Sequence, residues 1–265
     1  MAIGQGIFLG GNGSFNYYHW LLEIASKLQI LTLLPEYMRD IPLLVSRRVS
    51  EIDSFAEILR ILAPERKLIY LDPGKSYFIQ NPTFITPFVT APFNLKGSNK
   101  FFVEHFSTNP EAVRYLRKSI LPRIGETDSK KWPERIYLAR GNQRSYNQDE
   151  IIAIAIKNGF TILYPEQHSF LNQAAYFANA RVLVGPSGAA WSNLVFANPS
   201  CKALCWMPEE LGEFAAFSNI AGILGIDLRY LLYSSGIRST GDAYRHSYRI
   251  CPDLFQRALD YVLGY

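Results

Sequence analysis

A histidine and a glutamate stand four residues apart in the segment NYYHWLLE at positions 16–23. Residues four apart share one face of a helix, so His19 and Glu23 can touch. A carboxylate beside an imidazole fixes its tautomer and raises its basicity, which suits removal of a proton from a hydroxyl near neutral pH. The pair is a candidate catalytic base, supported by Asn16 and the glycine-rich approach 10–13. A buried structural histidine is the alternative.

A second candidate site is the small-residue segment 185–189, which follows an apolar run and opens a predicted helix. Such a turn exposes unpaired backbone N–H groups and the positive end of a helix dipole, and both favour a phosphate. Ser187, Gly188 and Ala189 would provide these groups, and Asn193 would orient the loop. The alternative is a tight connection that needs small residues only for packing.

The same serine also allows a weaker interpretation, as the nucleophile of a hydrolase. A nucleophile elbow needs glycine two residues after the serine, where this chain has Ala189. Asp242 and His246 nevertheless follow in the order of a catalytic triad. A serine hydrolase using Ser187 is therefore a minor alternative.

Two arginines follow a predicted strand that ends at Ala139. Arg140 and Arg144 would lie where the carboxyl ends of a parallel sheet face a ligand. The planar fork of arginine matches phosphate oxygens. Both are candidate diphosphate ligands, and solvated loop arginines are the alternative.

The composition limits the class of protein. The chain has 265 residues, 48% hydrophobic and 19% charged, which excludes disorder, collagen and coiled coil. Its net charge of +4 is spread along the chain, so a nucleic-acid surface is not supported. Three cysteines are too few for a disulfide framework and predict reduced thiols. No Asp-x-Asp and no metal-ligand spacing occur, so we expect no metal and no other cofactor.

The first half of the chain must position the histidine, and its pattern is irregular. Apolar spacing predicts a long helix over 16–34, closed by Pro35. Further predicted elements are a strand at 41–45, a helix from about 50 to 62, a strand at 67–71, short strands and loops over 72–98, and a helix over 100–121. Gly4, Gly6 and Gly10 miss the spacing of a dinucleotide-binding loop and are interpreted as loops.

The second half must position the arginines, and here strands and helices alternate regularly. The predicted strands are 135–139, 160–164, 181–184, 202–207 and 228–233. The predicted helices are 148–157, 169–178, 189–196, 214–224 and 252–263. This rhythm predicts βαβ units and a parallel sheet that binds ligands beyond the carboxyl ends of its strands.

The polar stretch 125–133 is predicted to be a linker between two domains. The N-terminal domain would span 1–124 and be small or incomplete, and the C-terminal domain would span 134–265. The last helix belongs to the second domain or packs back on the first. No stretch reaches the ~18 apolar residues of a membrane span, and the first residues lack the pattern of a secretion signal. We expect a cytoplasmic protein, with peripheral association at the inner face of the membrane left open.

The segments that carry chemistry resemble the motifs of glycosyltransferase family 61 over most of the chain. Residues 16–23 resemble the first motif, and 137–140 with Arg144, Asn147 and Glu150 resemble the second. The third and most specific motif is matched by Pro165, Glu166, Phe170, Gln173, Phe177, Ala180, residues 184–189 and Asn193.

Two positions depart from the family pattern. Ser187 stands where a histidine is usual, and Leu204-Cys205-Trp206 stands where an acidic residue is usual. These departures predict altered phosphate, ribose or base contacts, with either an unusual donor or a loss of activity.

The resemblance implies a GT-B architecture of two facing Rossmann-like domains. The C-terminal domain would hold a nucleotide-sugar, and the acceptor would enter from the N-terminal one. His19, assisted by Glu23, would deprotonate an acceptor hydroxyl, and the transfer would invert the anomeric carbon. Arg140, Arg144 and the backbone at 187–189 would stabilise the departing diphosphate without a metal.

The resemblance also implies the partners of such an enzyme. The donor would be a nucleotide-diphosphate sugar, UDP-linked by expectation, and the acceptor a glycan or glycolipid of a capsule or lipopolysaccharide pathway. The binding residues for substrate and nucleotide would be Asn16, Arg140, Arg144, Glu166, Ser187, Gly188, Ala189 and Asn193. A nucleotide- or carbohydrate-binding module without turnover is the rival interpretation.

Overall fold

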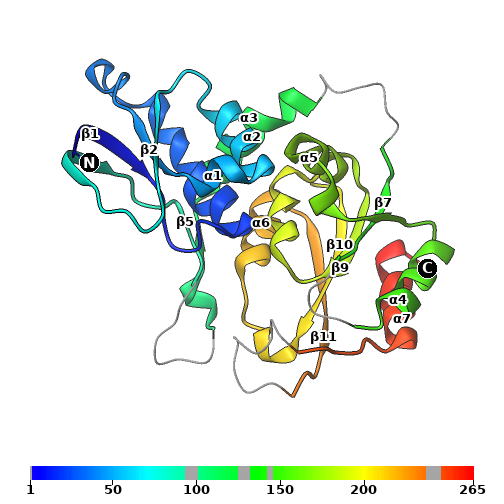
Figure 1. Cartoon of the computed structure of the whole chain (residues 1–265). Helices are drawn as coiled ribbons and strands as arrows, with labels where there is room; N and C mark the ends of the chain where they lie inside the picture. The colour runs from blue at the N-terminus through cyan, green and yellow to red at the C-terminus, as the bar shows by residue number, and fades with distance from the viewer. Residues whose placement is uncertain (1, 93–100, 125–131, 142–145, 237–245) are drawn as a thin grey trace.

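Two parallel β-sheets, one from each half of the chain, form the frame of the protein (Figure 1). The computed structural model describes residues 2–92, 101–124, 132–141, 146–236 and 246–265. The N-terminal sheet has the strand order β3-β2-β1-β4, and all neighbours are parallel. Its strands are β1 (Ala2–Leu9), β2 (Leu43–Ser46), β3 (Leu68–Leu71) and β4 (Phe78–Phe84). The predicted α/β class is thereby confirmed.

The inner position of β1 corrects the prediction of loops at Gly4 and Gly6, which both lie within this strand. A Cβ on Gly6 would lie 2.5 Å from Cγ of Leu44, so glycine is needed for the β2 side chain to pack across the strand. Glycine has a low strand propensity and adds nothing to the alternation of side chains. The sequence pattern therefore concealed the strand.

The segment predicted as one long helix over 16–34 is helical but is not a regular α-helix, because its winding and the span of its hydrogen bonds change along it. It consists of a π-helix, η1 (His19–Ile24), and a 3₁₀-helix, η2 (Ala25–Thr32). Where they meet, the buried Ser26 hydroxyl donates to the Leu22 carbonyl at 2.5 Å, a type of bond that competes with the backbone ladder. π-Turns are rare and are frequent at functional sites, and this one carries His19 and Glu23.

The N-terminal half also contains a set of helices and one short antiparallel pair. These are η3 (Glu36–Met38), α1 (Arg48–Glu51), α2 (Asp53–Leu62), β5 (Val89–Thr90), η4 (Val103–His105), β6 (Ser107–Thr108) and α3 (Pro110–Ile124). The helix predicted from residue 100 begins at Pro110, because proline suits the first helical turn and β6 occupies the residues before it. Of the predicted linker 125–133, residues 125–131 lie outside the described part of the chain.

The C-terminal sheet has the strand order β11-β10-β9-β7-β8 and is also parallel throughout. Its strands are β7 (Arg135–Leu138), β8 (Thr161–Leu163), β9 (Val182–Pro186), β10 (Lys202–Pro208) and β11 (Asp227–Tyr233). All were predicted to within two residues at each end. The order reverses between β7 and β9, and such a switch point opens a ligand crevice at the carboxyl ends of the strands.

Helices cover both faces of this second sheet. They are α4 (Gln148–Lys157), η5 (Pro165–Gln167), α5 (Phe170–Asn179), η6 (Ala189–Phe196), η7 (Glu209–Leu211), α6 (Ala216–Leu224) and α7 (Pro252–Leu263). Helices α4 and α7 pack together on the outer face, whereas α5 and α6 lie toward the N-terminal half (Figure 1). Because α7 packs on α4 and β10, the last helix stays with its own half of the chain.

One apolar core extends from the N-terminal half into the C-terminal half. It includes Ile7 of the first sheet together with Phe170 and Trp191 of the second half. Helix α3 packs on α5 and η6, and α2 packs on α5. The Glu57 carboxylate on α2 accepts the backbone N–H groups of Phe170 at 2.8 Å and Leu171 at 3.3 Å. A side chain from one half therefore caps the N-terminus of a helix from the other.

Candidate functional site

The histidine and the glutamate predicted to touch do so on η1. His19 Nδ1 lies 2.6 Å from Glu23 Oε2, and the other carboxylate oxygen accepts the backbone N–H of Ala91 at 2.5 Å. His19 is only 7% exposed. Since both Glu23 oxygens are engaged, the carboxylate fixes the orientation of the ring and favours the tautomer with its proton on Nδ1.

Asn16 organises the approach to this helix. Its side-chain oxygen accepts the N–H of Tyr18 at 2.9 Å, and its carbonyl accepts the N–H of Trp20 at 2.9 Å. Its own N–H donates to the carbonyl of Gly13 at 2.7 Å, and Gly13 has a left-handed φ of 66°. Asn16 thus shapes the turn that leads into η1, which gives it a structural role.

Arg140 lies at the predicted carboxyl edge, directly after β7. The side chain of Gln148 fixes its backbone, because Gln148 Oε1 accepts the N–H of Arg140 at 3.0 Å and Gln148 Nε2 donates to its carbonyl at 3.0 Å. A Cβ on Gly188 would lie 2.6 Å from Nη2 of Arg140. The guanidinium therefore lies against the residue that precedes η6, as expected for groups at neighbouring strand ends.

The two strands at the switch point approach unusually closely. A Cβ on Gly185 in β9 would lie 2.7 Å from Cβ of Leu138 in β7 and 2.9 Å from its carbonyl oxygen. Only glycine allows this approach. The small residue at 185 thus brings the end of β7, with Arg140, next to the 187–189 turn.

The 187–189 turn offers fewer donors than the sequence predicted. The N–H of Ser187 donates to the carbonyl of Trp206 in β10 at 2.8 Å, so this group is already engaged. Gly188 and Ala189 start η6, where N–H groups have no partner within the helix. The fully buried Ser192 donates its hydroxyl to the Ala189 carbonyl at 2.6 Å and faces the helix itself.

Asn193 is fully buried and connects the two halves of the chain. Its side-chain oxygen accepts the Tyr17 hydroxyl at 2.6 Å, and its amide nitrogen donates to Gln173 at 3.2 Å. Tyr17 stands two residues before His19, while the start of η6 contacts Arg140. Asn193 thus ties the start of η1 to η6, whose preceding residue Gly188 lies against Arg140.

Of the remaining predicted site residues, Glu166 is described by the structure and Arg144 is not. Glu166 is exposed on η5, and its Oε1 accepts the N–H of Gly141 at 3.2 Å, which steadies the residue after Arg140. Arg144 lies outside the described residues, as does Asp242 of the hydrolase interpretation.

Two residues of the second motif tie down the C-terminal segment. Asn147 accepts the N–H of Ile250 at 2.9 Å and donates to its carbonyl at 3.0 Å, as a neighbouring strand would. Glu150 pairs with Arg249 at 2.8 Å. These motif residues therefore hold residues 249–250 beside the start of α4.

An aromatic cluster occupies the end of β10. Trp206 is buried, and its indole N–H donates to the Tyr248 hydroxyl at 3.3 Å. Tyr248 is stacked between Tyr146 and Tyr233, with ring centroids 5.0 Å and 4.4 Å apart. The Tyr146 hydroxyl also lies 2.6 Å from that of Tyr137. Aromatic packing therefore fills the place where the resemblance in sequence leads us to expect an acidic residue.

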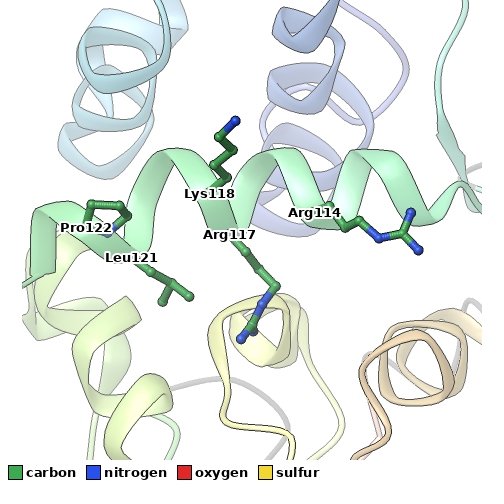
Figure 2. Close-up of a pocket in the computed structure, with 5 residues that line it drawn as sticks. All are labelled: Arg114, Arg117, Lys118, Leu121 and Pro122. Carbon is green, nitrogen blue, oxygen red and sulfur yellow. The ribbon is translucent and has the colours of Figure 1, made fainter.

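A groove of about 610 Å³ lies along α3 and is lined by three basic side chains, which point in different directions (Figure 2). Arg117 lines the groove, but its guanidinium is already engaged, because it donates to the carbonyls of Val195 and Ala197, each at 2.8 Å. Lys118 points to another side of the helix, and Arg114 pairs with Glu111. The cations diverge, so the groove is a poor anion site, whereas Arg117 satisfies carbonyl groups at the end of η6.

Replacing Arg117 with methionine is expected to lower the free energy of unfolding by about 2 kcal/mol, because hydrogen bonds from a charged donor contribute about 1.5–3 kcal/mol. The melting temperature should fall by roughly 4–8 °C in a circular dichroism experiment. Lys118→Met is the matched control on the same helix and should stay within about 0.5 kcal/mol of the unmodified protein. Equal melting temperatures for the two variants would show that the hydrogen bonds of Arg117 to the end of η6 do not stabilise the fold.

Across the described ranges, no group of three or more His, Cys, Asp or Glu side chains could hold a metal ion. No helix in the same ranges is long and apolar enough to cross a membrane.

Two parallel sheets with a His–Glu pair on one side and an arginine at the switch point of the other define an α/β protein with an enzyme-like site. The chain belongs to glycosyltransferase family 61, since the family model Glycosyltransferase 61 matches residues 17–204. It is accordingly a glycosyltransferase, with a sugar donor and an acceptor as substrates. No curated protein matches the chain.

Sequence reasoning missed several residues that shape the site. Gln148 was seen only as the start of a helix, and Tyr17 only as part of a motif. Lys27 interrupts an apolar run, and a charge within such a run is the one sequence signal that could have marked it. No sequence signal marks Arg117 or Glu57 as contacts between the two halves of the chain.

Proposed function

We propose that the protein is an inverting glycosyltransferase that moves a sugar from a UDP-linked donor to a hydroxyl of a glycan or glycolipid acceptor. In this proposal the two sheets correspond to the two Rossmann-like domains of a GT-B enzyme, with the donor on the C-terminal side. We place it in a bacterial capsule or lipopolysaccharide pathway, at the cytoplasmic face of the membrane.

The proposed reaction is a single displacement. His19 takes the proton of the acceptor hydroxyl on Nε2, while Glu23 holds the proton on Nδ1. The acceptor oxygen forms a bond to the anomeric carbon as the bond from that carbon to the diphosphate oxygen breaks, and the electron pair leaves with the nucleoside diphosphate. Attack from the opposite face inverts the anomeric centre.

Protein donors neutralise the leaving group in this mechanism, without a metal. Arg140 provides a guanidinium fork, and the N–H groups of Gly188 and Ala189 add the positive end of η6. Donors fixed in advance at a developing charge are among the largest contributions to catalysis. Arg144, Glu166 and Ser187 complete the proposed donor side, and Asn16 belongs to the acceptor side.

One observation carries the proposal: η6 connects the helix of the candidate base with the candidate anion site. Gly188, which precedes η6, lies against Arg140, and Asn193 of η6 accepts the hydroxyl of Tyr17 at the start of η1. In this proposal the donor sugar lies between the His19 imidazole, which receives the acceptor proton, and the Arg140 guanidinium, which faces the diphosphate. Asn193 acts in this scheme as the link rather than as a direct ligand.

The test begins with a thermal-shift screen of nucleoside diphosphates and their sugars against the full chain. A donor present at 100 times its dissociation constant should stabilise the fold by roughly 2.7 kcal/mol. Transfer to glycan acceptors would then be followed by proton NMR of the anomeric signal. Inverted product supports the proposal. Retained configuration, or stabilisation by no nucleotide-sugar, contradicts it.

The aromatic cluster at Trp206 favours a second candidate, a nucleotide-binding module without turnover. The cluster occupies the position at which the family usually has a carboxylate. Donor that binds tightly but is neither transferred nor hydrolysed would support this candidate. A fluorophosphonate probe tests the hydrolase alternative, which predicts labelling of Ser187.

A further inference from the structure

Lys27 is a buried charge on η2, the 3₁₀-helix that directly follows the helix of the candidate base. The residue is 6% exposed, and its ammonium donates to the carbonyl of Gly10 at 2.8 Å. Burying an ammonium costs far more than burying a methionine of similar size unless the charge is compensated. Packing alone therefore does not account for a lysine at this position.

Glu23, four residues earlier, provides a negative charge that acts on this ammonium. Burial lowers the pKa of Lys27 from its ordinary value, and the negative charge of Glu23 opposes that shift. Glu23 is also the partner of His19. Base, carboxylate and ammonium therefore follow one another along η1 and the start of η2, with His19 and Lys27 buried and Glu23 half-buried.

The carbonyl that Lys27 binds begins the glycine-rich segment between β1 and η1. A Cβ on Gly10 would lie 2.6 Å from Cζ of Phe8, and one on Gly11 would lie 3.4 Å from Cγ1 of Ile24, so the segment runs directly against η1. It follows the carboxyl end of β1, the edge of a parallel sheet that faces ligands. Lys27 thus links this edge to the helix of the candidate base.

We propose that Lys27 is a positioning residue for the acceptor side of the transfer reaction. It holds the start of segment 10–13 through the Gly10 carbonyl, and it adds a buried positive charge whose field acts on Glu23, the partner of His19. Lys27 lies on η2 in the N-terminal half of the chain, whereas Arg140 follows β7 of the C-terminal sheet, so we expect it to act on the acceptor side and not on the nucleotide. This inference rests on the proposed function, in which His19 receives the acceptor proton.

The kinetic test compares Lys27→Met, which removes the charge and the hydrogen bond, with Lys27→Arg, which retains both. We expect Lys27→Met to lower kcat by about 10- to 100-fold, the range for groups that orient a reactive one, and to raise the KM for acceptor. The KM for donor should stay within about twofold. Lys27→Arg should recover at least part of the loss. If kcat falls equally in both variants and the KM for donor also rises, Lys27 has only a structural role.

A second measurement needs no turnover, so it separates this inference from the proposed function. Nitrogen-15 NMR of the imidazoles, with His19 assigned by its loss in His19→Gln, reports which ring nitrogen carries the proton. We expect Lys27→Met to change the His19 signals and Lys118→Met to leave them unchanged. Unchanged His19 signals in Lys27→Met would overturn the inference, whether or not the protein transfers sugar. Lys27→Gln replaces the methionine variant if that variant does not fold.

Discussion

Replacing His19 with alanine is expected to lower kcat for sugar transfer by about 10²- to 10⁴-fold, the usual contribution of a general base. The ring contacts Glu23 through Nδ1 at 2.6 Å, so the variant loses both the proton acceptor and the fixed geometry. Donor binding should change little, because the candidate diphosphate ligands lie at the C-terminal sheet, whereas His19 lies in the N-terminal half of the chain. Steady-state kinetics for turnover and calorimetry for nucleotide affinity separate the two effects.

Two further variants sharpen the result for His19. Glu23→Gln keeps the shape of the carboxylate but not its charge, and we expect a smaller loss of kcat than for His19→Ala. His105→Ala removes another partly buried histidine, on η4, and should retain normal turnover. If His19→Ala loses only thermal stability while kcat is normal, the pair is a packing feature and the proposed mechanism is wrong.

The second large effect is expected at Arg140. Truncating Arg140 to alanine should weaken binding of the nucleotide-sugar by roughly 30- to 1,000-fold, since loss of one partner of a desolvated charge pair costs about 2–4 kcal/mol. Arg140→Lys should recover only part of this affinity, because an ammonium lacks the planar fork. Isothermal titration with the donor found in the thermal-shift screen measures both variants.

A matched control for Arg140 lies on the same strand. Arg135 stands at the opposite end of β7 and donates to the carbonyl of Asn158 at 2.8 Å. Arg135→Ala should therefore leave donor affinity unchanged. If Arg140→Ala binds donor as tightly as Arg135→Ala does, the diphosphate lies elsewhere and the switch point is not the donor site.

The second half of the fold was predictable because each local signal agreed with the tertiary arrangement. Apolar runs and helical spacing alternate there, and the strands of a parallel sheet are buried on both faces. The first half was harder, since Gly6 is required by the packing of Leu44, a partner that no local pattern reveals. The change of η1 to a π-helix likewise depends on buried polar side chains rather than on propensity.

The contacts of the candidate site also differ in whether the sequence could predict them. Contact between His19 and Glu23 follows from helix geometry, and proximity of Arg140 to the 187–189 turn follows from the rule that parallel strands end at one edge. The bond from Tyr17 to Asn193 spans 176 positions, and nothing in the spacing of residues could indicate it. The sequence shows how many N–H donors a turn contains. It does not show that the N–H of Ser187 is already bonded to the carbonyl of Trp206.

The apolar core shared by the two halves has a consequence for how substrates reach the site. Swinging the halves apart as on a hinge would hydrate the faces of α2, α3, α5 and η6, at about 25 cal/mol for each Å² of apolar surface, and would strip the Glu57 carboxylate from α5. We therefore expect substrates to arrive through local shifts at the strand ends, over a frame that stays closed.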